Sequence, residues 1–338
     1  MPLATVTSMN ESRTTVEGQS SHTICIQLPD LLAVCSPFEL RTNRHCKVIS
    51  LESERWLLDS RVALPSMKWG SAKVGLLAAA CYPTTDAPQL RLIADVLGLL
   101  VYQLDHQTLG TSTDDHSDAE SECSDTRTEQ GIFSLLSDRL SSAAYRNPAW
   151  YIRFHKAQRA FLHARCETPA FDVGNLERYI SFRRQHCGFL MPLEMIAYAG
   201  DLRLPENLLS NERLEILRDC ACDIAALSED IVYCAKGTPI DPLNVLSVIE
   251  SGSLEGALVM AGNIVNRRVN AFLDVERALL QGLTMDTQSG NESIRSYVQG
   301  LRDWVAGFVN WLYETERYFG DKGSEVRAFG WVFVPVQG

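Results

Sequence analysis

Apolar residues recur every three or four positions along most of the chain, and few segments alternate with a period of two. This spacing is typical of amphipathic helices, which bury one face. The pattern predicts helices at residues 52–64, 71–80, 89–104, 132–140, 148–164, 175–185, 192–199, 211–233, 253–280 and 292–318. Helices of these lengths favour a multi-helix bundle over short stacked repeats, so the predicted fold class is all-α.

Polar segments divide the chain into one domain and two terminal tails. Residues 1–24 are rich in Ser and Thr and are expected to form a disordered N-terminal tail. One α-helical domain is expected at 25–320, followed by a C-terminal tail at 321–338. Within the domain, the stretch 110–130, GTSTDDHSDAESECSDTRTEQ, is expected to be an acidic, flexible loop. Its acidic clusters could hold a cation, but solvated disorder is the interpretation we favour.

Composition narrows the class of protein. Hydrophobic residues make up 46% of the 338 positions, which is enough for a sizeable core. The formal net charge of -11 argues against a nucleic-acid partner, because phosphate binding needs a clustered basic face. Neither a signal peptide nor a membrane-spanning run is recognisable. We therefore expect a cytoplasmic protein, monomeric or homodimeric, with no membrane partner.

The ten cysteines lie mostly in apolar helical stretches. In a reducing compartment they are best interpreted as small buried hydrophobic residues. Cys220 and Cys222 form a CxC, whereas zinc sites usually pair a CxxC with further ligands, so a metal–thiolate site is not expected.

The stretch SEDIVYCAKG at 228–237 combines carboxylates, a lysine and a glycine at a predicted helix end. On a continuous helix, Glu229, Tyr233 and Gly237 share one face, with Lys236 beside them. Taken locally, the stretch could be an ordinary amphipathic helix end or the remains of a metal site.

Two further places carry candidate chemistry. Asp105 and His106 follow a strongly apolar helix, where they could mark a cavity mouth, although the local pattern favours ordinary surface residues. Arg183 lies in YISFRRQHCG, and Arg317 with Tyr318 ends WVAGFVNWLYETERYFG. Singly, such arginines usually form solvated or salt-bridged faces.

Together, these segments resemble a known family. The shared segments, in order, are LPDLL at 28–32, ESERWLLDS at 52–60, GLLAAACYP at 75–83, LRLIADVLGLLVYQLD at 90–105, YISFRRQHCG at 179–188, SEDIVYCAKG at 228–237 and WLYETERYFG at 311–320. Their order and rough spacing resemble microbial class I terpene cyclases, most of all fungal sesquiterpene synthases. The resemblance covers residues 25 to 320.

The resemblance implies a single helical bundle around a deep apolar pocket. In that family a DDxxD motif and an NDxxSxxxE motif hold three magnesium ions, which bind the diphosphate of a prenyl substrate. The diphosphate leaves, and an allylic cation forms. Magnesium requires oxygen ligands, and the leaving diphosphate requires neutralisation of its charge.

Both metal motifs are degenerate in this chain. The DDxxD position reads DHQTL at 105–109 and keeps only Asp105. The second motif falls on 229–237 and has Glu229, Tyr233 and Gly237 at its three ligand positions. The resemblance therefore implies a weak metal set of Asp105 and Glu229, so Mg²⁺ binding is possible with an incomplete ligand set, and no organic cofactor is expected.

The diphosphate donors of the family are all present. The family's sensor arginine stands about 46 residues before the second motif, which selects Arg183. Lys236 matches the lysine, and Arg317 and Tyr318 match the terminal RY pair. The other candidates are residues for acid–base chemistry, Asp105, His106, Glu229, Asp230 and Tyr233, and pocket residues, Tyr102, Cys187, Gly188, Trp304, Phe308 and Trp311. Aromatics such as these are more often plain core than pocket residues.

Two classes of function remain open. The first is a noncanonical terpene cyclase that acts on a farnesyl-type or terpenyl substrate through a carbocation, with weakened magnesium dependence and capture by an amine, an amino acid or another nucleophile. An ordinary magnesium-dependent sesquiterpene synthase is the alternative within this class. The second is a non-catalytic isoprenoid-binding protein, since a fold alone does not establish activity.

Overall fold

The computed structural model describes residues 23–62, 69–107, 131–167, 175–204, 211–237, 240–283 and 288–335. The secondary structure is, in order, β1 (Thr23–Gln27), α1 (Leu31–Val34), α2 (Cys46–Asp59), η1 (Trp69–Ala72), α3 (Val74–Cys81), α4 (Ala87–Gln107), η2 (Gly131–Leu136), α6 (Ser137–Ala144), α7 (Pro148–Cys166), α8 (Leu176–His186), α9 (Leu190–Ala199), α11 (Glu212–Tyr233), η3 (Cys234–Lys236), α12 (Val245–Val248), α13 (Leu254–Gln281), α14 (Gln288–Glu314), α15 (Glu316–Phe319), η4 (Gly320–Lys322), α16 (Gly323–Phe329) and β2 (Trp331–Pro335). The prediction of an all-α bundle is confirmed. The segments 1–22 and 108–130 lie outside the described residues, and with them most of the predicted tail and the predicted acidic loop.

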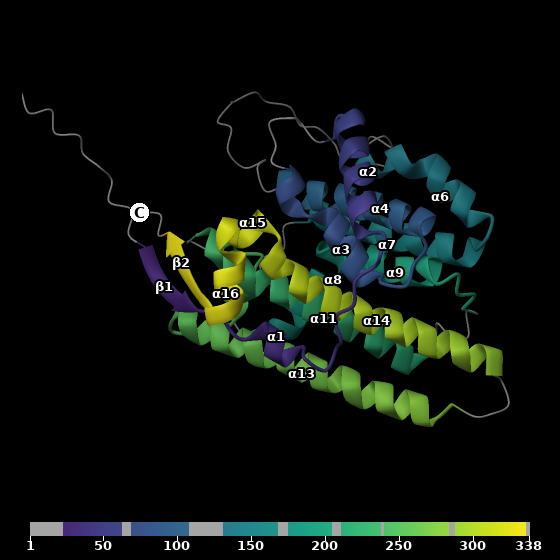
Figure 1. Ribbon diagram of the computed structural model, residues 1–338. Helices are drawn as coiled ribbons and strands as arrows, with labels where there is room; N and C mark the ends of the chain where they lie inside the picture. The colour runs from purple at the N-terminus through teal and green to yellow at the C-terminus, as the bar shows by residue number, and fades with distance from the viewer. Residues whose placement is uncertain are drawn as a thin grey trace, which may run out of the picture.

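Helix α11 runs through the centre of the bundle. It packs against α13 and α14, while α14 also packs against α3 (Figure 1). Nearly every residue of α11 from Cys220 to Val232 is buried, because the helix has neighbours on all sides. Asn211 caps its start by accepting a hydrogen bond from the backbone N–H of Arg213 at 3.0 Å. The central helix thus carries residues 229 and 230 at its buried C-terminal end.

Helix α14 lies unusually close to α3. A Cβ atom at Gly307 would fall 2.5 Å from the carbonyl carbon of Ala80, so only glycine permits this approach. The close contact brings the aromatic side chains of α14, including the fully buried Trp304, into the interior.

The predicted helix at 292–318 is two helices. Thr315 has an extended backbone, and its hydroxyl accepts a hydrogen bond from the backbone N–H of Arg317 at 3.4 Å, which caps α15. The same hydroxyl lies 3.4 Å from the carbonyl oxygen of Ser71. This break turns Arg317 and Tyr318 away from the axis of α14.

The ends of the domain differ from the sequence prediction. Residues 321–338 were expected to form a tail, yet the described part of this segment contains α16 and β2, and β2 pairs antiparallel with β1. Val332 and Val334 are buried, while Trp331 and Phe333 are exposed, so the strand has the alternation that a half-buried strand requires. Figure 1 shows this two-stranded sheet at one end of the bundle beside α16.

Several smaller features also differ from the expectation. Helix α2 begins at Cys46 and ends at Asp59, earlier than the predicted 52–64. Cys25 and Cys166 are exposed, whereas most of the other described cysteines are buried as expected. None of the described helices combines the length and the apolar character that a membrane crossing requires.

Candidate active site

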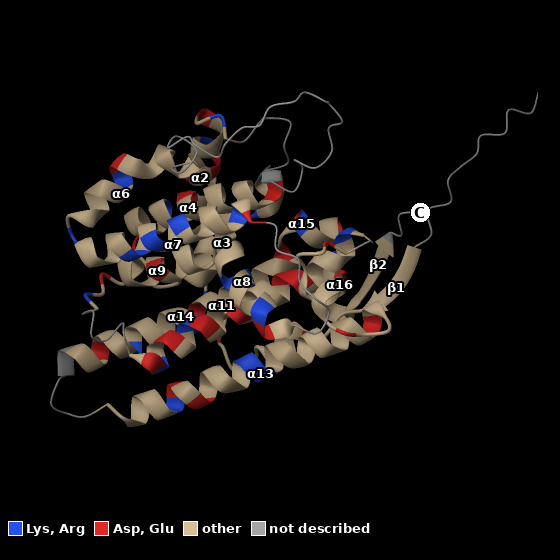
Figure 2. Ribbon diagram, turned by 180° about the vertical axis from the view of Figure 1, so that it is seen from behind, with Lys and Arg blue, Asp and Glu red and all other residues tan. Residues whose placement is uncertain are grey.

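Charged residues from four helices meet at the C-terminal end of α11. In Figure 2 the charged segments of α8 and α11 lie next to each other in the middle of the bundle. Arg183 comes from α8, Glu229 from α11, Asp105 from the last turn of α4 and Arg317 from α15. The structure therefore brings together residues that the sequence places up to 212 positions apart.

Arg183 binds both carboxylates of α11. Its Nη2 donates to Oδ1 of Asp230 at 2.8 Å and to Oε2 of Glu229 at 3.1 Å, and its Nε also donates to Asp230 at 3.1 Å. The Arg183 side chain is buried in the same network. Burial acts to lower its pKa, but the charge of Asp230 and other negative groups outweighs this and raises the pKa well above the ordinary value. Arg183 is therefore permanently charged.

Asp230 is held on every side. Its Oδ2 accepts hydrogen bonds from the Tyr179 hydroxyl and, at 3.3 Å, from the backbone N–H of Val245. Its carbonyl oxygen accepts a bond from the Asn244 side chain at 2.9 Å. Burial raises the pKa of Asp230 even though Arg183 opposes the shift. This arrangement supports a positioning role for Asp230, because its carboxylate oxygens are already engaged with Arg183, Tyr179 and Val245.

Glu229 joins the two halves of the network. While Oε2 accepts from Arg183, Oε1 accepts a hydrogen bond from the Tyr318 hydroxyl at 2.7 Å and lies 3.8 Å from Nη1 of Arg317. Glu229 is buried, yet it has partners on both oxygens. Its carboxylate lies where the hydrogen-bond donors of α8 and α15 converge.

Asp105 is bound by Arg317. The Nη2 atom of Arg317 donates to Oδ1 of Asp105 at 2.5 Å, and its Nε donates to Oδ2 at 3.3 Å. Nη1 of Arg317 also donates to the Tyr318 hydroxyl at 3.0 Å. His106 lies in the same turn of α4, but its side chain falls outside the described part of the structure.

The helical register predicted for 229–237 does not continue to its end. Helix α11 stops at Tyr233, a 3₁₀ turn follows, and Gly237 has φ 135°, which is a glycine conformation. Gly237 therefore does not share the α11 face of Glu229. The ammonium of Lys236 lies 4.7 Å from the centre of the Tyr233 ring and 5.5 Å from that of the Tyr318 ring.

The environment changes the acid–base properties of these two side chains. Although part of Lys236 is exposed, desolvation by the surrounding protein and then the charge of Arg317 lower the pKa of its ammonium. Burial, followed by the charges of Asp241 and Asp105, raises the pKa of the Tyr233 phenol, so it stays neutral. A neutral phenol is a poor replacement for a metal-binding hydroxyl flanked by carboxylates.

A small apolar cavity begins at this network. Its volume is about 10 Å³, and its lining includes Phe189, Trp304, Phe308 and Trp311 together with the polar residues Glu229 and Arg317. Of the predicted pocket residues, Trp304, Phe308 and Trp311 line the cavity, whereas Tyr102, Cys187 and Gly188 are not among its lining residues. Ligand pockets usually measure hundreds of Å³, so this cavity is far smaller than an ordinary ligand pocket.

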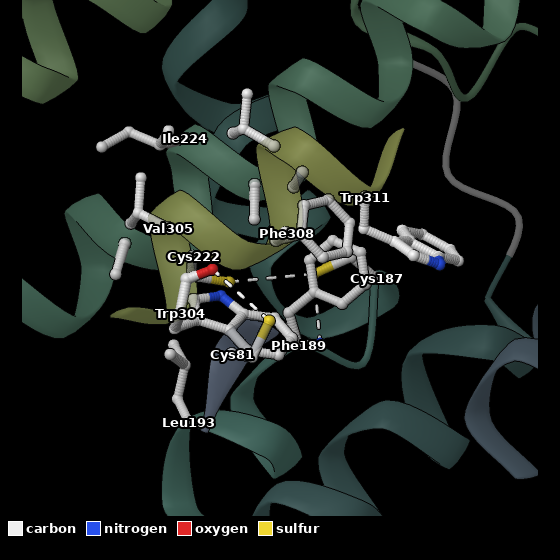
Figure 3. Close-up of a cluster of buried hydrophobic side chains, with 14 of the residues drawn as sticks. Cys81, Cys187, Phe189, Leu193, Cys222, Ile224, Trp304, Val305, Phe308 and Trp311 are labelled. Carbon is white, nitrogen blue, oxygen red and sulfur yellow. Dashed lines mark hydrogen bonds between the residues drawn. The ribbon is translucent and has the colours of Figure 1, made fainter. Parts of the chain in front are cut away.

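Aromatic rings pack closely around this cavity. The Phe189 and Phe308 rings lie 4.7 Å apart, and the Trp304 and Phe308 rings 5.4 Å apart (Figure 3). Cys187 and Cys222 lie beside this cluster with their sulfur atoms 3.8 Å apart. The Trp311 indole is anchored by donating to the carbonyl oxygen of Ala72 at 2.9 Å. An apolar, aromatic wall thus adjoins a charged rim.

The described residues do not fit a three-magnesium cluster. Among them, no group of three or more His, Cys, Asp or Glu side chains is placed to hold a metal ion. Asp105 is paired with Arg317, Glu229 with Arg183 and Tyr318, and Gly237 offers no side-chain ligand. Magnesium is usually held by one or two free carboxylates together with waters and substrate phosphates, and the two carboxylates at these positions are already paired with cationic or hydroxyl donors.

Sequence reasoning missed Tyr179 and Asn244, which hold Asp230 in place. Tyr179 precedes Arg183 by one helical turn, so the i, i+4 rule could have placed both on the face toward α11. Asn244 caps α12 after a loop, and no periodicity in this part of the sequence predicts its contact with Asp230.

Comparisons with known proteins define the class. The chain matches the family model described as terpene synthase family 2, C-terminal metal binding, over residues 111–271. It is 30% identical to the sesquiterpene synthase Agr1 of Cyclocybe aegerita over 325 residues, an alignment that spans 90% of this chain and 91% of that protein. This chain therefore belongs to the terpene synthase family and is a terpene cyclase by class.

Further relatives and solved structures agree with this assignment. Alpha-muurolene synthase of Coprinopsis cinerea is 28% identical, with 89% of this chain and 75% of that protein aligned. Wild-type cucumene synthase superposes with a TM-score of 0.67 at 20% identity and covers 82% of this chain and 98% of that structure. Germacradien-4-ol synthase from Streptomyces citricolor gives a TM-score of 0.62 at 21% identity, with 82% and 96% covered. The structural likeness shows that the fold is that of class I terpenoid synthases.

Proposed function

We propose that this chain is a noncanonical terpene cyclase with weakened dependence on magnesium. It binds the diphosphate of a farnesyl-type or already cyclised terpenyl substrate through Arg183, Lys236, Arg317 and Tyr318. The names of the relatives, which include several sesquiterpene synthases, support a fifteen-carbon isoprenoid diphosphate as substrate.

One observation carries the proposal. The carboxylates of Asp105 and Glu229, the two residues left at the family's metal-ligand positions, are hydrogen-bonded to the side chains that we propose to bind diphosphate. Glu229 is bound by Arg183 at 3.1 Å and Tyr318 at 2.7 Å, and Asp105 is bound by Arg317 at 2.5 Å. A hydrogen bond that already satisfies a carboxylate competes with a metal ion for the same lone pairs. These contacts instead hold the donors in position for an anion.

Substrate binding then adds an acceptor to these donors. The donors Arg183, Arg317 and Tyr318 keep their places, and diphosphate oxygens join the carboxylates as acceptors, so that the buried carboxylates keep their cationic partners. Because the donors are fixed beforehand, little side-chain entropy is lost on binding. The prenyl chain extends from this rim into the aromatic cavity and widens it.

The reaction breaks the C–O bond between the prenyl carbon and the diphosphate, which leaves with the electron pair. The resulting cation lies against aromatic faces, each of which stabilises it by about 0.5–2 kcal/mol. An amine, an amino-acid nitrogen or another nucleophile donates its lone pair to the cation, and the proton then released passes to a base. Glu229 is the carboxylate that reaches both the rim and the cavity.

The test is a product assay with farnesyl diphosphate. Purified protein is incubated in EDTA or in magnesium, with and without a panel of amines and amino acids, and products are identified by mass spectrometry. We expect terpenyl adducts or terpenoid products that persist in EDTA and disappear in Tyr318→Phe. Volatile sesquiterpenes formed only with magnesium would instead establish an ordinary sesquiterpene synthase, the function that the relatives' names favour.

A further inference from the structure

The charges of the proposed diphosphate site cancel before any substrate arrives. The positive charges of Arg183, Lys236 and Arg317 face the negative charges of Asp105, Glu229 and Asp230. A diphosphate group brings two or more further negative charges, and buried charge must be neutralised nearby. Additional donors should therefore lie close to this network.

Arg165 and His186 are placed for this role. His186 ends α8, three residues after Arg183, and Arg165 lies in the last turn of α7, which packs against α8. The Nη1 atom of Arg165 lies 3.2 Å from Nε2 of His186. Neither residue was identified from the sequence.

This contact determines which nitrogen of His186 carries the proton. An arginine has only donors, so Nε2 of His186 must accept, and the neutral ring carries its hydrogen on Nδ1. Burial lowers the pKa of His186 to about 3, and the charges of Arg183 and Arg165 add to the effect. The imidazole is therefore neutral at physiological pH, with an Nδ1–H donor.

That donor is buried and has no partner among the residues that the structure describes. His186 is only 8% exposed, its ring stacks on Phe182 with centroids 5.0 Å apart, and Nδ1 makes no hydrogen bond there. Leaving such a donor unsatisfied costs about 1–3 kcal/mol. Most buried polar groups are hydrogen-bonded, so this unpartnered donor calls for an explanation, and a bound ligand is one.

Arg165 shares the electrostatic environment of the site. Burial lowers its pKa, the charge of Arg183 lowers it further, and Glu229 and Tyr233 act in the opposite direction. Arg165 is thus near enough to Arg183 and Glu229 for their charges to act on it. An anion placed between the two arginines would relieve the repulsion.

We propose that Arg165 and His186 form a second phosphate subsite, which binds the terminal phosphate of the diphosphate that Arg183, Arg317 and Tyr318 hold. Arg165 supplies the additional positive charge, and the Nδ1–H of His186 donates a hydrogen bond to a phosphate oxygen. This inference rests on the proposed function, since it extends the same diphosphate site.

The experiment measures binding of inorganic diphosphate to the full chain in EDTA by isothermal titration calorimetry. Arg165→Ala and His186→Phe are compared with Arg159→Ala, an exposed arginine of the same helix that serves as the matched control. We expect each of the first two variants to weaken binding about tenfold, and the control to stay within about twofold of the wild type.

Stability separates ligand binding from a structural role. His186→Phe removes an unsatisfied buried donor and, at the same time, the acceptor of one Arg165 hydrogen bond, and it keeps a ring on Phe182, so its melting temperature should stay within about 4 °C of the wild type. A larger decrease in melting temperature with unchanged diphosphate affinity would overturn the inference.

The variant Lys236→Ala, in the proposed diphosphate site, distinguishes failure of the second subsite from failure of the proposed function. If Lys236→Ala weakens binding while Arg165→Ala and His186→Phe do not, the second subsite is refuted and the proposed function stands. If the wild-type chain binds no diphosphate, or if none of the three variants changes the affinity, the proposed function itself is refuted, and the second subsite with it.

Discussion

Arg317 forms a bidentate ion pair with Asp105, with Nη2 2.5 Å from Oδ1 and Nε 3.3 Å from Oδ2. The resemblance to the family places Asp105 at the position of the aspartate-rich motif, and we propose Arg317 as a diphosphate donor. An arginine fork that matches both oxygens of a carboxylate is among the stronger ion pairs in proteins. Asp105 is therefore better described as a residue that positions the Arg317 guanidinium than as a free metal ligand.

Asp105→Asn tests this description. The amide can still accept from Arg317, but it no longer adds negative charge beside an incoming diphosphate. We expect the affinity for inorganic diphosphate in EDTA to increase about fivefold, which corresponds to roughly 1 kcal/mol of relieved repulsion. The measurement is calorimetric titration, with Asp138→Asn on the surface of α6 as the control. Wild-type binding that is tighter in magnesium than in EDTA, with this gain lost in Asp105→Asn, would show that Asp105 is a metal ligand after all.

The ion pairs of Arg183 should be important for stability. Arg183→Ala leaves the carboxylates of Asp230 and Glu229 buried without their main partner, which costs about 3–5 kcal/mol of unfolding free energy. Urea denaturation followed by circular dichroism measures this loss.

The exposed pair between Arg327 and Glu314 supplies the comparison, because Arg327→Ala should cost less than about 1 kcal/mol. The double variant Arg183→Met with Asp230→Asn should recover part of the stability that Arg183→Ala loses. An Arg183→Ala protein as stable as the Arg327→Ala protein would contradict the network described above.

His186 predicts a dependence of stability on pH. Its pKa falls from the ordinary 6.5 to about 3 on folding, so the unfolded chain binds a proton between these values and the folded chain does not. Stability from this group is present above pH 6.5 and is lost as the pH falls toward 3. Between pH 6.5 and 4.5 the unfolding free energy should decrease by about 2 kcal/mol more in the wild type than in His186→Phe.

His163→Gln is the matched control, since this histidine of α7 is exposed and paired with Glu167 at 3.1 Å. Denaturation is measured at several pH values. The plot of unfolding free energy against pH should have the same slope for His163→Gln and for the wild type. If the plot of unfolding free energy against pH has the same slope for His186→Phe as for the wild type, the imidazole is not kept neutral by its surroundings.

Restoring the missing glutamate should not restore the metal site. At Gly237 the backbone has φ 135°, which a residue with a side chain adopts only with strain, and the position has left helix α11. Gly237→Glu should lower stability by about 1–3 kcal/mol and leave magnesium affinity unchanged. Gly252→Glu, at an open position without a positive φ, is the control and should be tolerated. Tight magnesium binding in Gly237→Glu would indicate that the helix can extend to this residue.

The helical periodicity was sufficient to predict the bundle. The family segments named Asp105, Glu229 and Arg317 as candidates, and the structure brings these residues together. The break at Thr315 and the turn after Tyr233 were not predictable from periodicity, because both depend on backbone hydrogen bonds formed at helix ends. The pairing of β1 with β2 joins the two ends of the described chain, and such long-range contacts leave little local signal beyond the alternation at 331–334.

The pocket shows a second limit of the sequence. Trp304, Phe308 and Trp311 recur at helical spacing and do line the cavity, but the same spacing also suits ordinary core residues. Cys187 and Gly188 follow Arg183 closely, yet the cavity lies on the side of the α14 aromatics. Which residues reach a cavity depends on how helices pack, and Gly307 at the contact with α3 shows how one position controls that packing.

The central claim is that this chain binds diphosphate through its own cationic side chains. Calorimetric titration of inorganic diphosphate into the wild-type protein, once in EDTA and once in excess magnesium, tests it most directly. The account predicts affinities that agree within about threefold in the two buffers and that fall about tenfold in Lys236→Ala in both. Binding that occurs in magnesium and vanishes in EDTA would contradict it.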